Sequence, residues 1–159
     1  MAKTAKTNAM RILDKEGLAY TSYTYGGDEF LDGITVAGMI GKPMEQVFKT
    51  LVTRGTHGEI FVFVIPVAQE LALKEAAKAV GEKAVDMLPA KEITAITGYL
   101  KGGCSPIGMK KLYRTVIDAS AQNLTTMIFS AGKRGMQLEM APQDLAKVCH
   151  ADFAQVVAV

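Results

Sequence analysis

Two apolar runs joined by a short polar segment place the strongest constraint on how this chain can fold. Residues 47–53 and residues 60–65 are rich in β-branched and aromatic side chains and have the length of strands, so both fit buried strands. Residues 54–59 between them contain two glycines, which favours a turn and an antiparallel hairpin. The second run is the longest apolar run, and its six residues fall far short of the roughly 20 that a membrane helix requires.

Helices and further strands follow one another along the rest of the chain. Helical spacing and capping residues predict helices between Thr7 and Gly17, from Val36 to Gly41, and over residues 71–80, 90–96 and 142–148. Pro43 is expected to open another helical turn. Strands are predicted over residues 19–25, 83–87, 115–118, 127–130 and 136–140. The fold class is therefore α/β (or α+β): a single domain over residues 1–159, with a mixed, mostly antiparallel sheet surrounded by helices.

Composition narrows the possible function classes. The 159 residues are 49% apolar and 21% charged, with 18 basic against 16 acidic residues, which excludes disorder and does not by itself indicate a nucleic-acid partner. The N-terminus lacks a secretory signal, and two cysteines make a thin disulfide framework, so we expect a cytoplasmic protein. No CxxC or HExxH motif occurs and there are only two histidines, so we expect neither a metal site nor a cofactor.

Lys49 is the most unusual residue of the pattern. Strand alternation places it on the same face as Val47 and Leu51, while Phe48 and Val52 make the other face apolar as well. Burying an ammonium group is costly unless it is paired. Lys49 is therefore either an edge-strand lysine whose stem extends to water or a cation at the floor of a pocket. In a pocket it would hold a phosphate, a carboxylate or an ester oxygen.

Two glycine-rich segments are further candidates for a site. Residues 98–108 contain four glycines, and the N–H groups of Gly102 and Gly103 could bind an anion or a carbonyl oxygen, although a glycine pair is more often only a tight turn. Ser130 precedes the basic turn 131–135, which is either a plain hairpin turn or a ligand-binding loop. Neither segment has the spacing of a dinucleotide-binding loop or a P-loop.

A cysteine nucleophile is the alternative catalytic interpretation. Cys104 could be activated by His57 or His150, but no local pattern brings either histidine to it, and a small buried cysteine is the more common case. Ser105 lacks the sequence context of a serine nucleophile.

Basic and aromatic residues around the glycine loop allow contact with nucleic acid. Tyr20, Tyr23 and Tyr25 on the first strand fit the core, yet one of them could close a pocket or stack on a base. The basic residues form either a solvated surface or a footprint for a tRNA backbone: Lys101, Lys110, Lys111, Arg114, Lys133 and Arg134.

Together these motifs resemble the YbaK/EbsC family of free-standing Cys-tRNA(Pro) deacylases and the editing domain inserted in bacterial prolyl-tRNA synthetases. The resemblance covers nearly the whole chain and is specific in three segments: residues 46–51, 98–108 and 130–135. It implies an α/β fold with a central pocket for the 3′-terminal adenosine and its esterified amino acid. It also implies which residues form the pocket: Lys49, Gly102 and Gly103 in the catalytic role, and Tyr25, Phe30, Thr50 and Ser130 in binding.

The family resemblance also implies a mechanism. The thiol of the substrate cysteine attacks its own ester carbonyl, while Lys49 and the glycine loop stabilise the oxyanion, and Cys104 takes no part. Some members carry an aspartate where this chain has Gln137, so no carboxylate role is transferred. The expected partners are the acceptor end of aminoacyl-tRNA and, as a candidate, prolyl-tRNA synthetase. No membrane association is expected, and the sequence does not decide between a monomer and a homodimer. Two alternatives stay open: a non-catalytic module that binds a tRNA end or a nucleotide, and a related deacylase for alanine or another amino acid.

Overall fold

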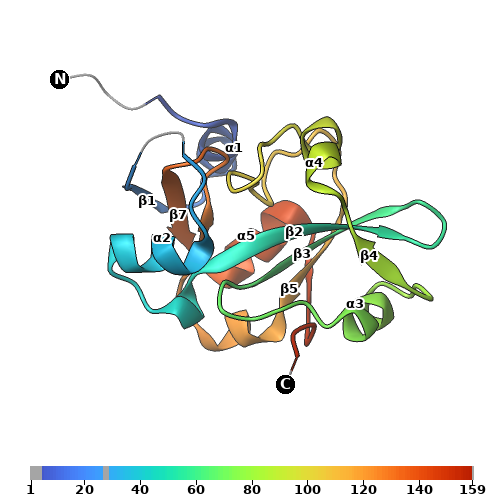
Figure 1. Cartoon of the computed structure of the whole chain (residues 1–159). Coiled ribbons are helices and arrows are strands. Elements are labelled where there is room, and N and C mark those ends of the chain that lie inside the picture. Colours follow the sequence, from blue (N-terminus) through green and yellow to red (C-terminus); the bar gives the residue numbers. More distant parts are fainter. Residues whose placement is uncertain (1–4, 27–28, 159) are drawn as a thin grey trace.

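The computed structural model describes residues 5–26 and 29–158, and within them eight strands form two sheets (Figure 1). The larger sheet has the strand order β4 (Val85–Met87), β2 (Phe48–Gly55), β3 (Ile60–Pro66), β5 (Arg114–Asp118) and β8 (Asp152–Ala154). The smaller sheet has the order β1 (Thr21–Thr24), β7 (Met136–Met140) and β6 (Met127–Ser130). The mixed α/β fold predicted from the sequence is confirmed.

The predicted hairpin forms the centre of the larger sheet. β2 and β3 pair antiparallel from Phe48 opposite Pro66 to Arg54 opposite Ile60. β3 pairs parallel to β5, and β5 parallel to β8, which the sequence did not predict because these pairings join distant segments. The strands also fall into two sheets rather than one, connected by a single parallel bridge between Val47 and Ile128.

Helices pack against the two sheets, while β1, β4 and β8 keep exposed residues. They are α1 (Asn8–Glu16), α2 (Gly33–Ile40), α3 (Leu73–Ala79), α4 (Ala90–Thr97), α5 (Pro142–Cys149) and the 3₁₀ helices η1 (Met44–Gln46) and η2 (Ala119–Asn123). Thr7 caps α1 by accepting a hydrogen bond from the Met10 N–H, and Gly17 ends the helix with φ +70°. Pro43 precedes η1, as expected. Among the described residues, no helix is long and apolar enough to cross a membrane.

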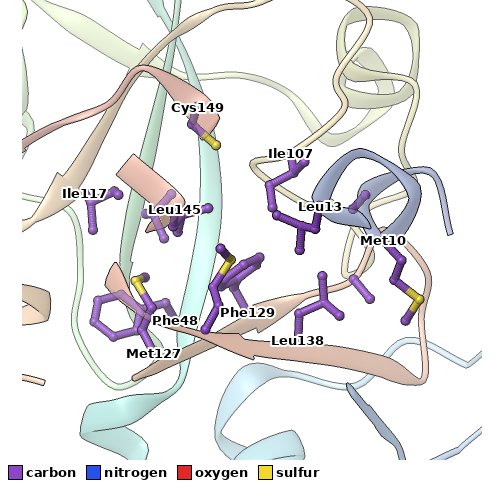
Figure 2. Close-up of a cluster of buried hydrophobic side chains, with 14 of the residues drawn as sticks. Met10, Leu13, Phe48, Ile107, Ile117, Met127, Phe129, Leu138, Leu145 and Cys149 are labelled. Atoms are coloured by element: carbon purple, nitrogen blue, oxygen red, sulfur yellow. The ribbon is translucent and has the colours of Figure 1, made fainter. Parts of the chain in front are cut away.

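The main core lies between the two sheets and two helices. Phe48 of β2 and Phe129 of β6 meet Leu13 of α1 and Leu145 of α5 there (Figure 2). A second cluster covers the opposite face of the larger sheet, where Phe63 of β3 packs against the buried alanines of α3. Both sheets thus share one core, and β2 runs along the boundary between them.

Candidate active site

A cavity of about 520 Å³ lies where the two sheets meet. It is lined by residues from β2, α2, the start of α4, the glycine loop and the ends of β6 and β7. The structure thereby brings together five residues expected at the site, Phe30, Lys49, Thr50, Gly102 and Ser130. A volume of this size is typical of a small-molecule site.

Part of the cavity lining is a stretch of β2 along one edge of which no strand of residues 5–26 and 29–158 is paired. On that edge β4 pairs with residues 53–55, and the Leu88 N–H donates to the Val52 carbonyl at 3.0 Å. The bridge from Val47 to Ile128 holds the other end of the strand. Thr50 lies between these two attachments. Because backbone polar groups two residues apart in a strand point to the same side, those of Thr50 point to the same edge as those of Val52, where no neighbouring strand is paired with it among the described residues. The Thr50 hydroxyl oxygen is also buried without a hydrogen-bond partner among the described residues.

Lys49 occupies this same stretch of β2. Its side chain is half-buried and lines the cavity. Within residues 5–26 and 29–158, no carboxylate forms an ion pair with its ammonium group. A partly desolvated, unpaired cation beside an orphaned hydroxyl is suited to an anionic or strongly polarised oxygen of a ligand. Lys49 pairs with Ile65 of β3 in the interior of the larger sheet, and its half-buried side chain lines the cavity, which favours the interpretation of Lys49 as a pocket cation.

One wall of the cavity comes from the smaller sheet. Ser130 and Gln137 are opposite one another in the β6–β7 pair, and both are buried and line the cavity. The Ser130 Oγ accepts a hydrogen bond from the Gly132 N–H at 3.2 Å, so its own proton can be donated to a ligand. The Gln137 Nε2 donates to the Tyr25 hydroxyl at 3.2 Å. Tyr25 itself does not line the cavity and is connected to it through Gln137.

The mouth of the cavity is formed by Phe30 and the glycine loop. Phe30 is 49% exposed, and the Lys101 ammonium and the Arg134 guanidinium lie 5.4 and 5.6 Å from its ring centroid. Gly102 has φ +85°, and a Cβ atom there would lie 2.6 Å from Phe30 Cδ2. Glycine is therefore favoured at residue 102 by its left-handed backbone, and a larger residue would also displace the exposed phenyl ring.

Gly103 differs from Gly102 in its surroundings. Its N–H donates to the Leu100 carbonyl at 2.9 Å, which closes a turn, and the residue does not line the main cavity. A Cβ atom at Gly103 would lie 2.9 Å from the backbone nitrogen of Arg134, so this glycine allows the loop to pack against the turn 131–135. The expectation that both N–H groups face a ligand is therefore corrected: Gly102 remains the backbone candidate, and Gly103 supports the loop.

The cysteine nucleophile is not supported by the structure. Cys104 lines the cavity, but burial raises the pKa of its thiol to about 11 despite a hydrogen bond from Thr97 that lowers it. His57 lies in the exposed β2–β3 turn and His150 is exposed at the end of α5. A thiol with so high a pKa and no adjacent base is a poor nucleophile. Among the described residues, no group of three or more His, Cys, Asp or Glu side chains converges as metal ligands would.

The basic residues separate into two groups. Lys101, Lys133 and Arg134 surround the mouth, and the Arg134 Nε donates to the Lys101 carbonyl at 2.8 Å. Lys110 donates to the Ala95 carbonyl of α4, and Lys111 is exposed beside α1 and α5. The Arg114 guanidinium instead donates to the carbonyls of Ala79 and Val80 at the end of α3. Arg114 therefore holds the end of α3, and its side chain is still exposed, so its place in the footprint stays a prediction.

Apolar side chains that no sequence motif indicated complete the lining. Leu88 follows β4, Ile93 belongs to α4, and Val67 packs so closely on the start of α2 that a Cβ atom at Gly33 would lie 2.3 Å from its Cγ1. Nothing in their sequence context separates them from ordinary core residues. Only the meeting of distant segments makes them cavity residues.

Comparison with known proteins gives concordant results. A model of the aminoacyl-tRNA editing domain matches residues 34–148. The chain is 45% identical, over 95% of its length and 93% of the relative, to an Enterococcus faecalis protein named as a candidate Cys-tRNA(Pro)/Cys-tRNA(Cys) deacylase, EbsC. It is similar in fold to a candidate trans-editing enzyme for prolyl-tRNA synthetase (TM-score 0.80, 19% identity, 98% and 100% of the two chains). A hypothetical protein of known crystal structure is also similar (TM-score 0.84, 21% identity, 94% and 98%).

Proposed function

Because the chain belongs to the aminoacyl-tRNA editing domain family, we propose that it clears cysteine from mischarged Cys-tRNA(Pro), and also from Cys-tRNA(Cys), by cleaving the 3′ ester. The observation that carries the proposal is the cavity between the two sheets. It combines the unpaired Lys49 cation, the orphaned Thr50 hydroxyl and the Ser130 hydroxyl with apolar walls. The 45% identity to the Enterococcus faecalis protein named as a candidate deacylase supports the substrate class.

In the proposed reaction the substrate supplies its own nucleophile. The cysteine sulfur attacks the ester carbonyl carbon and forms a C–S bond, the C–O bond to the ribose breaks, and the ribose oxygen leaves with the proton that the thiol gives up. The products are free tRNA and a cyclic thiolactone, which makes the enzyme a lyase; attack by water would make it a hydrolase. The enzyme then acts by positioning and by stabilising the oxyanion.

Two groups of this chain are suited to that oxyanion. The Lys49 ammonium supplies a full charge, and the Gly102 N–H supplies a backbone donor at the mouth of the same cavity. Removing a single donor of this kind typically lowers the rate by about 10²–10³. Ser130 and Thr50 would hold the ribose or the amino acid, and Phe30 offers an exposed ring on which the terminal base can stack.

The whole chain is proposed to act as one editing unit in the cytoplasm, with the acceptor end of aminoacyl-tRNA as its substrate. The family match begins at residue 34, yet Leu13 of α1 is fully buried in the core that also contains Phe129 and Leu145. The packing of α1 in this core supports a single folding unit that extends beyond the matched residues. Prolyl-tRNA synthetase is the proposed partner because the trans-editing protein of similar fold is described as acting for that enzyme.

The proposal is tested by the release of labelled cysteine from Cys-tRNA(Pro), with Ala-tRNA(Pro) measured in parallel. The wild type is expected to release cysteine and spare alanine, because an alanine ester lacks the thiol. Lys49→Met keeps most of the volume of the side chain and removes the charge, and it is expected to lower the rate about 10²–10³-fold with the fold retained.

Lys74→Ala is the matched control, because Lys74 is exposed on α3 and does not line the cavity. Near-normal turnover by Lys49→Met would contradict the assigned role of Lys49. Equal rates on cysteinyl and alanyl esters would favour the water-dependent deacylase. Binding of uncharged tRNA without loss of either ester would favour the non-catalytic module.

A further inference from the structure

A second, smaller cavity opens beside the proposed active site. It has a volume of about 210 Å³ and is lined by Gly98, Tyr99, Leu100, Gly103, Gly132, Lys133 and Arg134. Lys101 and Gly102 line the main cavity, while Leu100 and Gly103 line this one. Residues 100–103 are therefore the wall between the two cavities, and a flexible ligand leaving the first cavity at its mouth can enter the second.

The lining of this Tyr99 cavity is suited to a flat, partly apolar group. The Tyr99 ring is held in place because its hydroxyl donates to the Ile107 carbonyl at 2.5 Å and because a Cβ atom at Gly132 would lie 2.9 Å from Tyr99 Cε1. Leu100 presents an apolar side chain that is 57% exposed. Its volume of about 210 Å³ is less than half of the 520 Å³ of the main cavity, which suits a smaller group such as a single base.

The charged residues around the Tyr99 cavity indicate which charge its ligand carries. Lys133 and Arg134 line it, Lys101 lies on the adjacent wall, and none of the lining residues is acidic. This arrangement disfavours a cationic ligand and favours one that carries a phosphate. An aromatic ring beside a cationic ridge is the usual combination in sites for single-stranded nucleic acid, where the ring stacks on a base and the cations follow the backbone.

We propose that the Tyr99 cavity binds the base of the nucleotide that precedes the terminal adenosine of the tRNA. The phosphodiester between the two nucleotides then crosses the loop 101–103, between Lys101 and Lys133. The inference rests on the proposed function, since it takes the terminal adenosine to be in the main cavity. It gives the acceptor strand a direction on the surface, from the mouth at Phe30 toward the turn 131–135.

The test compares the affinities of the uncharged dinucleotide cytidylyl-adenosine and of adenosine 5′-monophosphate, measured by calorimetry. Both carry a phosphate on the 5′ side of adenosine, and only the dinucleotide carries a second base. The wild type is expected to bind the dinucleotide at least about fivefold more tightly, the lower end of what one base–aromatic stack contributes. Tyr99→Leu and the exposed Leu100→Ala are expected to lower that ratio toward one, and Lys74→Ala is expected to leave it unchanged.

Equal affinities of the wild type for the two probes would overturn the inference. So would Leu100→Ala or a folded Tyr99→Leu that keeps the wild-type ratio. Neither result depends on turnover, so the proposed function is judged separately, by loss of cysteine from Cys-tRNA(Pro). If Leu100→Ala reduces the preference for the dinucleotide but the wild type cleaves no ester, base binding in the Tyr99 cavity would be supported and the deacylase function refuted.

Discussion

At the scale of single residues, the cavity contains a thiol that the proposed reaction does not use. Burial raises the pKa of Cys104 to about 11, so at pH 8 only about one thiol in a thousand is ionised. We expect Cys104→Ser to deacylate Cys-tRNA(Pro) within a few-fold of the wild-type rate, measured under single-turnover conditions. A loss of rate as large as that expected for Lys49→Met would instead support Cys104 as the nucleophile.

Alkylation of the same thiol gives an independent measurement. In a Cys149→Ser variant, which leaves Cys104 as the single cysteine, the rate of reaction with iodoacetamide should rise about tenfold per pH unit from pH 7 to pH 10. The slope follows because the thiolate fraction increases tenfold per unit at every pH below the raised pKa. A rate that levels off near pH 9, the ordinary range of a thiol, would contradict the assigned burial.

Residue patterns predicted part of the site and missed part of it for a physical reason. Lys49 and the Gly102 loop stand out in the sequence because a charge within an apolar strand and a glycine pair both conflict with local patterning. Thr50 and Gln137 produce no such conflict, since polar residues are common in half-buried strands, and only the family resemblance indicated Thr50. Their importance comes from the unpaired edge of β2 and from the β6–β7 register, which are long-range features.

At the scale of elements, Glu139 on β7 joins segments that flank the site. It accepts hydrogen bonds from Tyr23 on β1, from Thr126 before β6 and from Gln46 of η1, and the Lys42 ammonium lies 3.9 Å away. Burial alone would raise the pKa of Glu139, but the hydrogen bonds from Thr126 and Tyr23 and the charge of Lys42 outweigh it and lower the pKa. The carboxylate form therefore stabilises the folded state.

Glu139→Gln is expected to lower the free energy of unfolding by about 1–3 kcal/mol at pH 7, because charge-assisted hydrogen bonds become neutral and one acceptor becomes a donor. In the wild type this contribution is present above the unfolded-state pKa of 4.5 and is lost as the pH falls from there through the lower pKa of the folded state. Urea unfolding at pH 7 and pH 4 measures both effects. Glu75→Gln on the exposed face of α3 is the control, and equal stability of the two variants at pH 7 would refute the stabilising role of Glu139.

Local signals predicted element ends better than element partners. The Thr7 cap and the left-handed Gly17 define α1 within a few residues of the chain, and both function as expected. β8 was missed because its three residues are too few to show alternation and because it is held by parallel pairing to β5, far away in the sequence. The separation into two sheets was missed for the same reason, since the bridge from Val47 to Ile128 joins residues about half the chain apart.

At the scale of the whole molecule, the site exists because two sheets share one core. Lys49 and Thr50 come from the larger sheet and Ser130 and Gln137 from the smaller one, and Phe48 and Phe129 pack in the core beside them. Any change that shifts one sheet against the other would separate the two halves of the cavity. Global stability and site geometry are therefore coupled, and conditions that weaken the core should lower activity before they unfold the chain.

Alkaline pH is such a condition, because the core holds two buried thiols. Burial raises the pKa of Cys149 to about 12 and that of Cys104 to about 11, from an ordinary value of 9.0. Between pH 9 and pH 10 the unfolded chain releases thiol protons that the folded chain retains, so stability falls as the pH rises, by up to about 1.4 kcal/mol per pH unit for each thiol. Urea unfolding at pH 8, 9 and 10 should show this decline in the free energy of unfolding of the wild type. In Cys149→Ala the part of the decline that the thiols cause should be about half as large. A decline of equal steepness in the wild type and in the Cys104→Ala/Cys149→Ala double variant would show that other groups cause it.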